Sequence, residues 1–204
     1  NPLMHAKFLN DLHEIKNILL YFNKIIPDII DFSIISMTSL LAHYFHDDGT
    51  LCLFNGSNNT HLSQINLLLK NNEFSKKRNF DSNMNGIAFY NDKSKKIFLD
   101  VVQPTKNNIN KNLSASSLAL EFSGLGEKII TNCGALEKSG RNPEYLRYSA
   151  AHSTIILQNT NISEIRIDKI HKKFPKQVSF NCNKLNNFTI WNSSHNGYIK
   201  KFKK

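Results

Sequence analysis

Several patterns that would identify a common class of protein are missing from this sequence. The three cysteines, Cys52, Cys133 and Cys182, are an odd number without regular spacing, so they do not form a disulfide framework. No Cys-x-x-Cys pair occurs, which excludes a zinc knuckle. GxSxG, GxGxxG and Walker glycine loops are also missing, so the common hydrolase and nucleotide-binding classes have no support.

Long hydrophobic runs are missing as well. No apolar stretch approaches the roughly 18 residues that cross a bilayer, so we expect no membrane span. The first residues do not follow a signal-peptide pattern, and the chain begins with Asn1 rather than Met. We therefore expect the sequence to be a piece of a longer protein.

Positive charge is in clear excess. The chain has 26 Lys and Arg against 16 Asp and Glu, which gives a formal net charge of +10. A basic surface favours an anionic partner such as an acidic polysaccharide, an anionic lipid or a nucleic acid. The bias toward Asn and Lys, as in NNINKNLS at 107–114, also fits an AT-rich genome, so charge alone leaves both interpretations open.

The N-terminal part of the chain shows a helical pattern. Apolar residues with helical spacing predict a helix near 5–24, and Pro27 separates it from a second apolar helix near 28–46. A third, short helix is predicted near 61–71. The apolar face expected for the first helix consists of Phe8, Leu12, Ile15, Leu19 and Phe22.

Beyond about residue 85 the hydrophobic pattern changes from helical spacing to short apolar runs separated by polar turns. Nine or so runs of this kind predict the strands of an antiparallel β-sandwich. In one of them Leu118, Leu120 and Phe122 point one way, while Ala119 and Glu121 point the other. The predicted fold class is therefore α+β, with a helical unit at 1–80 followed by an antiparallel β unit at 81–204.

His152 stands in LRYSAAHSTIILQ, 146–158, at the start of an apolar run that predicts a strand. Position alone fits either a working residue or a polar residue tolerated where a strand begins. The neighbours favour a site, because Arg147 can bind a carboxylate through two hydrogen bonds and Tyr148 is a second proton carrier. We take His152 as the candidate catalytic residue, with Arg147 and Tyr148 as candidate substrate-binding residues.

A second histidine, His195, precedes an Asn-Gly pair that predicts a hairpin turn. A polar hairpin is one interpretation. In the other, His152, His195 and Asp168 form a zinc site with two nitrogen ligands and one oxygen ligand. A metal-bound His152 could not also act as a free base, so these two roles compete. The remaining nucleophile, Cys133, is expected to be buried and inert.

Taken in order along the chain, these stretches resemble the heparinase II/III-like family of polysaccharide lyases. YFHDDGTLCLFNG, 44–56, resembles the end of the helical toroid of that family, and SLALEFSGLGEKIITNCGA, 117–135, resembles its first sandwich strands. LRYSAAHSTIILQNTNISEI, 146–165, is the most specific stretch and resembles the Arg…Ala-His-Ser/Asn-Thr strand. SSHNGYIKKF, 193–202, resembles a later His-Asp/Asn-Gly-Tyr strand.

The resemblance implies an incomplete α/α toroid followed by a β-sandwich, with an acidic polysaccharide bound between them. It implies β-elimination on uronic acids of the heparin, heparan or alginate type. A base removes the proton at C5, a neighbouring group neutralises the carboxylate, and the O4 leaving group receives a proton. The resemblance assigns His152 to the family cleft and implies a periplasmic or secreted bacterial protein.

The chain departs from the family pattern in one respect. The catalytic tyrosine of the family and its asparagine or histidine partner lie earlier in the toroid, and no matching stretch occurs here. We expect the missing toroid helices of the same parent chain to supply them, and this piece alone to be inactive. No cofactor other than the possible zinc is expected. The alternative is a non-catalytic module that binds a polyanion or carbohydrate. Nucleic acid is not expected, because the aromatic residues lack the repeated stacking pattern of a single-strand binder.

Overall fold

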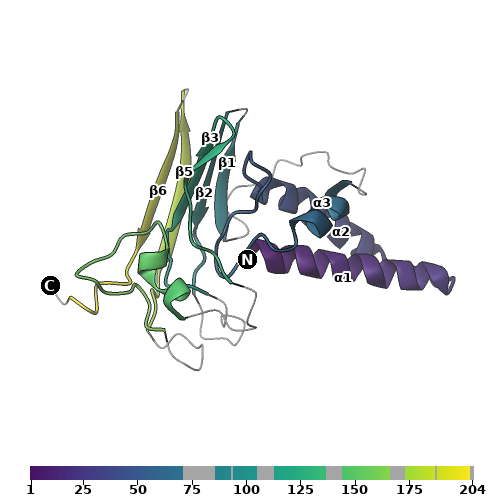
Figure 1. Ribbon diagram of the computed structural model, residues 1–204, viewed down its shortest axis with the longest axis horizontal. Coiled ribbons are helices and arrows are strands. Elements are labelled where there is room, and N and C mark those ends of the chain that lie inside the picture. Colours follow the sequence, from purple (N-terminus) through teal and green to yellow (C-terminus); the bar gives the residue numbers. More distant parts are fainter. Residues whose placement is uncertain are drawn as a thin grey trace.

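A computed structural model describes residues 1–70, 86–92, 94–104, 113–136, 144–165, 173–186 and 188–202. Helices gather at one end of the molecule and strands at the other (Figure 1). The helical part contains α1 (Pro2–Tyr21), α2 (Asp28–Leu41), the 3-10 turn η1 (Ala42–Tyr44) and α3 (Leu62–Lys70). The predicted helices near 5–24, 28–46 and 61–71 are therefore confirmed, with shifts of a few residues at their ends.

The buried face of α1 is different from the predicted one. Leu3, Ala6 and Leu9 are buried, whereas Phe8 is 57% exposed and Phe22 is 62% exposed. The periodicity located the helix correctly but not its packed side, because the position of the neighbouring segments decides which side is covered. The Asn1 side chain accepts a hydrogen bond from the Met4 amide and caps the helix.

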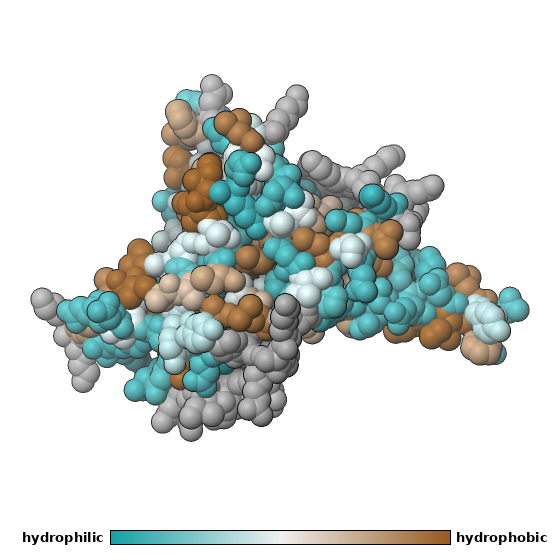
Figure 2. All heavy atoms as spheres, in the orientation of Figure 1, coloured by the Kyte–Doolittle hydropathy of each residue, from teal (hydrophilic) through white to brown (hydrophobic). Residues whose placement is uncertain are grey.

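The outer side of α1 and α2 is strongly apolar. Figure 2 shows hydrophobic residues at the far end of the helical part, where α1 projects from the rest of the molecule. Burying such a surface is favourable, so a soluble chain that exposes it normally has a partner for it. The large hydrophobic residues exposed here are Met4, Phe8, Ile15, Ile18, Leu20, Tyr21, Phe22, Ile25, Ile29 and Phe32.

The β part contains two antiparallel sheets. The first has the order β1-β2-β3-β4, formed by Ile87–Asn91, Lys95–Asp100, Leu120–Gly124 and Glu127–Ile130. The second pairs β5 (Val178–Leu185) with β6 (Phe188–His195). Gln103, which follows β2, connects them, because its side chain donates to the Pro175 carbonyl and accepts from the Val178 amide. Antiparallel β structure after residue 85 is thus confirmed.

Two predicted strands are replaced by other structure. The run at 153–157 is irregular and leads into a tight turn at Gln158 and Asn159, both in the left-handed region. Its first backbone amides bond elsewhere: the Ser153 amide donates to the Asn132 side chain, and the Thr154 amide donates to the His152 carbonyl. The run at 198–202 forms turns. A third, at 164–168, lies partly outside the described residues.

The Asn196-Gly197 pair does not form the predicted hairpin turn. Strand β6 ends just before it, at His195, and the chain then enters a series of turns. The hairpin reverses at the other end of β5 and β6, where Asn186 has a left-handed backbone. The Asn196 side chain instead accepts from the amides of Lys176 and Gln177.

The alternation predicted for β3 is present, but its polar side is the more deeply buried one. Glu121 and Ser123 are fully buried, while Leu120 and Phe122 are half-buried. Glu121 Oε2 lies 2.7 Å from His46 Nε2, and His46 Nδ1 lies 2.9 Å from the Ser123 hydroxyl. Because His46 follows η1, this pair ties the helical part to the first sheet.

The other carboxylate oxygen of Glu121 also accepts hydrogen bonds. Its Oε1 accepts from the Leu53 amide, from the Asn132 amide and from the Asn132 side chain, at 2.9–3.1 Å. Burying a carboxylate is costly unless hydrogen bonds replace its water. With His46 on Oε2, the partners of Glu121 come from three places in the chain, so the network fixes their mutual arrangement.

We expect His46→Ala to destabilise the protein by about 3 kcal/mol, because Glu121 would remain buried without one of its partners. The double variant His46→Leu/Glu121→Leu should recover part of this loss. As a control, Asp31→Asn removes the exposed ion pair of Asp31 with Lys16, at 2.6 Å, and should cost less than about 1 kcal/mol. Urea unfolding measures all three; equal losses for His46→Ala and Asp31→Asn would contradict the structural role of the network.

Candidate functional site

His152 lies at the end of two consecutive 3-10 turns, η3 (Glu144–Arg147) and η4 (Ser149–Ala151). Its backbone is extended and its amide donates to the Ser149 carbonyl. The residue is buried, with 8% of its surface exposed. The predicted position on the first turn of a strand is therefore wrong: a compact turn, held by side-chain hydrogen bonds, carries this histidine.

Ser149 anchors the turn from one side. Its hydroxyl donates to the Ala115 carbonyl at 2.6 Å and accepts from the Ile162 amide at 2.9 Å. Its own amide donates to the Asn161 side chain. These contacts join the segments before, within and after the turn, so the main chain that carries His152 is fixed.

Asn132 anchors the turn from the other side. Its side-chain oxygen accepts from the Ser153 amide at 3.0 Å, while its side-chain nitrogen donates to Glu121 at 2.9 Å. The Cys133 amide in turn donates to the Ala151 carbonyl. A continuous chain of hydrogen bonds thus runs from His46 through Glu121 and Asn132 to the residue that follows His152.

The side chain of His152 is unusual in its hydrogen bonding. Both ring nitrogens are buried, and neither meets hydrogen-bond geometry with a residue in the described part of the chain. Burial lowers the pKa of His152 to about 4, although the nearby Leu146 backbone and the Glu121 carboxylate oppose part of this fall. The imidazole is therefore neutral at pH 7, and its lone pair is not bonded by any described residue.

The two predicted substrate-binding residues lie in different environments. Arg147 is only 5% exposed, and its Nε and Nη2 donate to the Leu113 carbonyl at 3.2 and 3.0 Å. This contact gives Arg147 a structural role in holding the turn. Tyr148, in contrast, is 37% exposed. Tyr148 is thus the more accessible of the two for contact with a ligand, and binding of substrate by either residue stays a prediction.

The structure does not test the predicted three-residue metal site. Asp168 lies outside the described residues, and within the described ranges no group of three or more His, Cys, Asp or Glu side chains could hold a metal ion. His195 Nδ1 accepts the Gly197 amide at 3.1 Å, which places the proton of a neutral ring on Nε2. Binding a metal would require His195 to change tautomer or to release this contact.

The described residues also bear on the cysteines and on the length of the helices. Cys133 is exposed, so the expectation that it is buried is wrong; Cys52 is the buried cysteine. Among the helices that the structure describes, none is long and apolar enough to cross a membrane.

A second buried carboxyl group belongs to Asp100, at the end of β2. It accepts from Asn55 and Ser116 side chains and from the Val102 amide. Burial raises the pKa of Asp100 to about 6, although these hydrogen bonds oppose the rise. His152 and Asp100 therefore depart from their ordinary pKa values in opposite directions.

The pH dependence of stability follows from these two shifts. Between about pH 6.5 and 4 the unfolded chain protonates His152 before the folded one does, so this residue destabilises the protein as the pH falls. Asp100 stabilises the protein as the pH falls, because the folded state takes up its proton before the unfolded state does. The stability that it contributes is lost as the pH rises through about 6. Each contribution is at most about 3 kcal/mol.

We expect the two contributions to offset each other in the unaltered protein. Asp100→Asn should reveal a loss of stability as the pH falls from 7 to 4, and His152→Gln should reverse that slope. Urea unfolding at several pH values, compared with the unaltered protein, measures both slopes. Parallel pH profiles for the two variants would show that His152 and Asp100 do not titrate as their burial requires.

Comparison with known proteins places this arrangement in a family. The model of the C-terminal domain of heparinase II/III-like proteins matches residues 77–204. The chain therefore belongs to the heparinase II/III-like family, as the resemblance predicted. The match includes His152 and the turns that carry it.

Solved structures show the same fold over nearly the whole chain. The heparan sulfate lyase HepC from Pedobacter heparinus aligns with a TM-score of 0.67 and 16% identity, over 97% of this chain and 34% of that one. The heparinase III-BT4657 gene product aligns with a TM-score of 0.62 and 14% identity, over 96% of this chain and 35% of that one. The chain thus spans about a third of the length of these structures. No curated protein matches it.

Sequence reasoning proposed His152 as a candidate but did not identify the residues that position it. Glu121 and Asn132 carry the hydrogen-bond chain to the turn, and His46 completes it. The one signal in the sequence was an acidic residue on the small-residue side of a strand, ALEFS at 119–123, where a buried carboxylate needs donors. Those donors lie far away in the sequence, so they could not be identified from it.

Proposed function

We propose that this chain is part of a polysaccharide lyase that cleaves uronic-acid polysaccharides, of the heparin, heparan or alginate type, by β-elimination. The observation that carries the proposal is His152: a buried, neutral imidazole whose ring nitrogens have no hydrogen-bond partner among the described residues, on a turn fixed from two sides. Fixed placement of this kind is what proton transfer requires. Family membership supports the lyase class, and the basic surface suits an acidic substrate.

In the proposed reaction His152 exchanges a proton with the sugar. Elimination removes the hydrogen at C5 of the uronate, breaks the C4–O4 bond and leaves a C4=C5 double bond, while O4 receives a proton. A neutral imidazole with a low pKa accepts a proton only when the geometry is favourable, so the fixed turn contributes through positioning. Tyr148, the exposed neighbour, is proposed to contact the sugar, and Arg147 to bind its carboxylate if ligand binding releases it from Leu113.

We further propose that α1 and α2 are the last helices of an α/α toroid whose earlier helices belong to the same parent chain. The exposed apolar side of α1 and α2 supports this, because preceding helices would cover it. Those helices would also supply the remaining proton donor and carboxylate-binding group. The domain boundary near residue 80, a periplasmic or secreted bacterial location and the inactivity of this piece alone belong to the same proposal.

The central test is His152→Ala in the full-length protein. We expect turnover to fall roughly 10²-fold or more, as when an acid–base group is lost, with little change in melting temperature. His61→Ala, a histidine substitution before α3, serves as the control and should leave turnover unchanged. The rate is measured from the absorbance of the unsaturated product. Near-full activity of His152→Ala on every uronate polymer cleaved by the parent would contradict the proposed role.

Zinc bound by His152, His195 and Asp168 stays a prediction that competes with the role of His152 as a free base. His152 offers unoccupied ring nitrogens, whereas His195 would first have to release the Gly197 amide. If the site forms, elemental analysis of the full-length protein will find zinc, and His195→Ala will lower that content and the melting temperature together. Zinc-free protein with full activity and stability would remove the metal from the proposal.

The alternative is a module that binds polyanions without cleaving them. The net charge of +10 favours it, since positive charge supports binding but supplies no proton transfer. If the full-length protein binds heparin-type oligosaccharides but forms no unsaturated product under any condition, this alternative is correct.

A further inference from the structure

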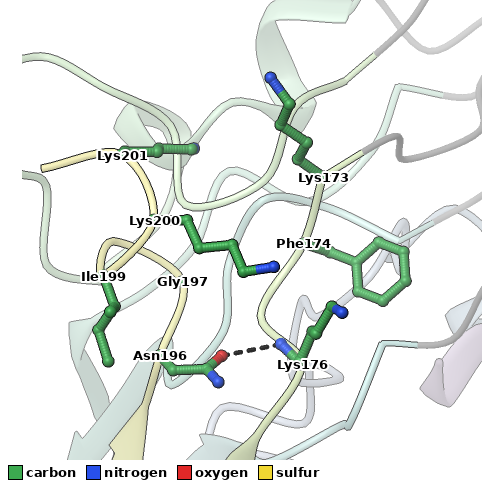
Figure 3. Close-up of a pocket in the computed structure, with 8 residues that line it drawn as sticks. All are labelled: Lys173, Phe174, Lys176, Asn196, Gly197, Ile199, Lys200 and Lys201. Carbon is green, nitrogen blue, oxygen red and sulfur yellow. Dashed lines mark hydrogen bonds between the residues drawn. The ribbon is translucent and has the colours of Figure 1, made fainter. Parts of the chain in front are cut away.

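A basic hollow lies at the end of the β5–β6 hairpin, where β5 begins and β6 ends. It has a volume of about 300 Å³ and is lined by residues of two segments, 173–176 and 196–201. Figure 3 shows Lys200 pointing across it from one wall toward Phe174 on the other. The lining contains four lysines and no acidic residue.

The walls of the hollow are held by short-range contacts. Asn196 accepts from the amides of Lys176 and Gln177, which fixes the two segments against each other. A Cβ atom at Gly197 would lie 2.9 Å from the side chains of Ile162 and Pro175, so the backbone at Gly197 packs closely against both residues. The shape therefore belongs to the fold itself.

Two of the four lysines are already engaged. Lys201 donates to the Asn161 and Ile162 carbonyls, and Lys173 pairs with Glu164 at 3.5 Å. Lys176 and Lys200 are exposed, and neither ammonium group has a hydrogen-bond or ion-pair partner within the described ranges. These two lysines are thus available for an anion that enters the hollow.

The hollow also has apolar walls. Phe174 and Ile199 line it together with the lysines. Small-molecule sites combine apolar walls with a few charged groups, and 300 Å³ is at the lower end of their volume range. A pyranose ring with a charged substituent satisfies both features, since its C–H face packs on apolar side chains while the substituent reaches an ammonium group.

We propose that this hollow is a second binding site for a sulfated or carboxylated sugar unit, separate from His152, with Lys176 and Lys200 as its anion-binding residues. The choice of a sugar among anionic ligands rests on the proposed lyase function; the anion site itself does not. The hollow and the turn of His152 are connected, because the Tyr198 hydroxyl bonds the carbonyls of Ile155 and Thr160 in the loop that follows His152.

Two other polyanions fit less well. Single-stranded nucleic acid binds on successive aromatic side chains, and Phe174 is the single aromatic residue in the lining. An anionic membrane binds convex polybasic segments or amphipathic helices, whereas this surface is concave.

The test compares two charge-matched variants of the full-length protein on a His152→Ala background, which should slow cleavage during the titration. Lys176→Gln/Lys200→Gln removes the two available charges of the hollow. Lys24→Gln/Lys184→Gln removes two exposed charges elsewhere, from the loop after α1 and from β5. Calorimetric titration with a heparin-derived tetrasaccharide should show one class of sites weakened about tenfold or more in the first variant and unchanged in the second. A neutral maltotetraose should not bind the hollow in either.

The outcomes separate this inference from the lyase proposal. If tetrasaccharide binding is weakened equally in both variants, or is not weakened in the first, the site is overturned even if the parent protein cleaves uronates. Weaker binding of the tetrasaccharide in the first variant alone supports the site, even if the parent protein cleaves no uronate polymer. If oligothymidylate or phosphatidylserine vesicles bind as tightly as the tetrasaccharide, with the same dependence on Lys176 and Lys200, the assignment to a sugar is wrong.

Discussion

The buried carboxylate of Glu121 is the interaction on which the rest of this structure depends. It lies in the middle of β3, fully enclosed, and accepts hydrogen bonds from His46, Leu53 and Asn132. Desolvating a carboxylate is costly unless every acceptor position is used, so such a group tolerates few alternative arrangements of its neighbours. It therefore fixes how the helical part, the first sheet and the segment after β4 are joined.

The placement of His152 is a consequence of that arrangement. Asn132 presents its oxygen to the Ser153 amide while its nitrogen donates to Glu121, so Glu121 orients the amide group. A loop without secondary structure would normally be mobile, yet here the main chain on both sides of His152 bonds to fixed groups. The position is thus set by buried polar contacts, which combine a rigid backbone with an imidazole that has no bonded partner among the described residues.

Local features of the sequence predicted where the helices lie. Contacts between residues far apart in the sequence decided which faces are buried and which partners the side chains have. Pro27 and the helical spacing located α1 and α2, but the packed face of α1 depends on where its neighbours lie. An arginine beside a candidate site predicts a ligand contact, yet Arg147 donates to the Leu113 carbonyl, a bond between residues 34 positions apart in the sequence. The apolar run after His152 has the composition of a strand, but its first amides, of Ser153 and Thr154, donate to the Asn132 side chain and the His152 carbonyl instead of to a ladder.

Net charge illustrates the same limit on what a sequence can show. An excess of +10 suits an anionic partner but gives it no location. In the basic hollow the structure separates lysines that are already engaged, Lys173 and Lys201, from the two that remain available. An anion gains most where cations are fixed close together beside apolar walls, because the field is stronger there and less water must be reordered. For the proposed anion site, the arrangement of a few lysines therefore says more than their number.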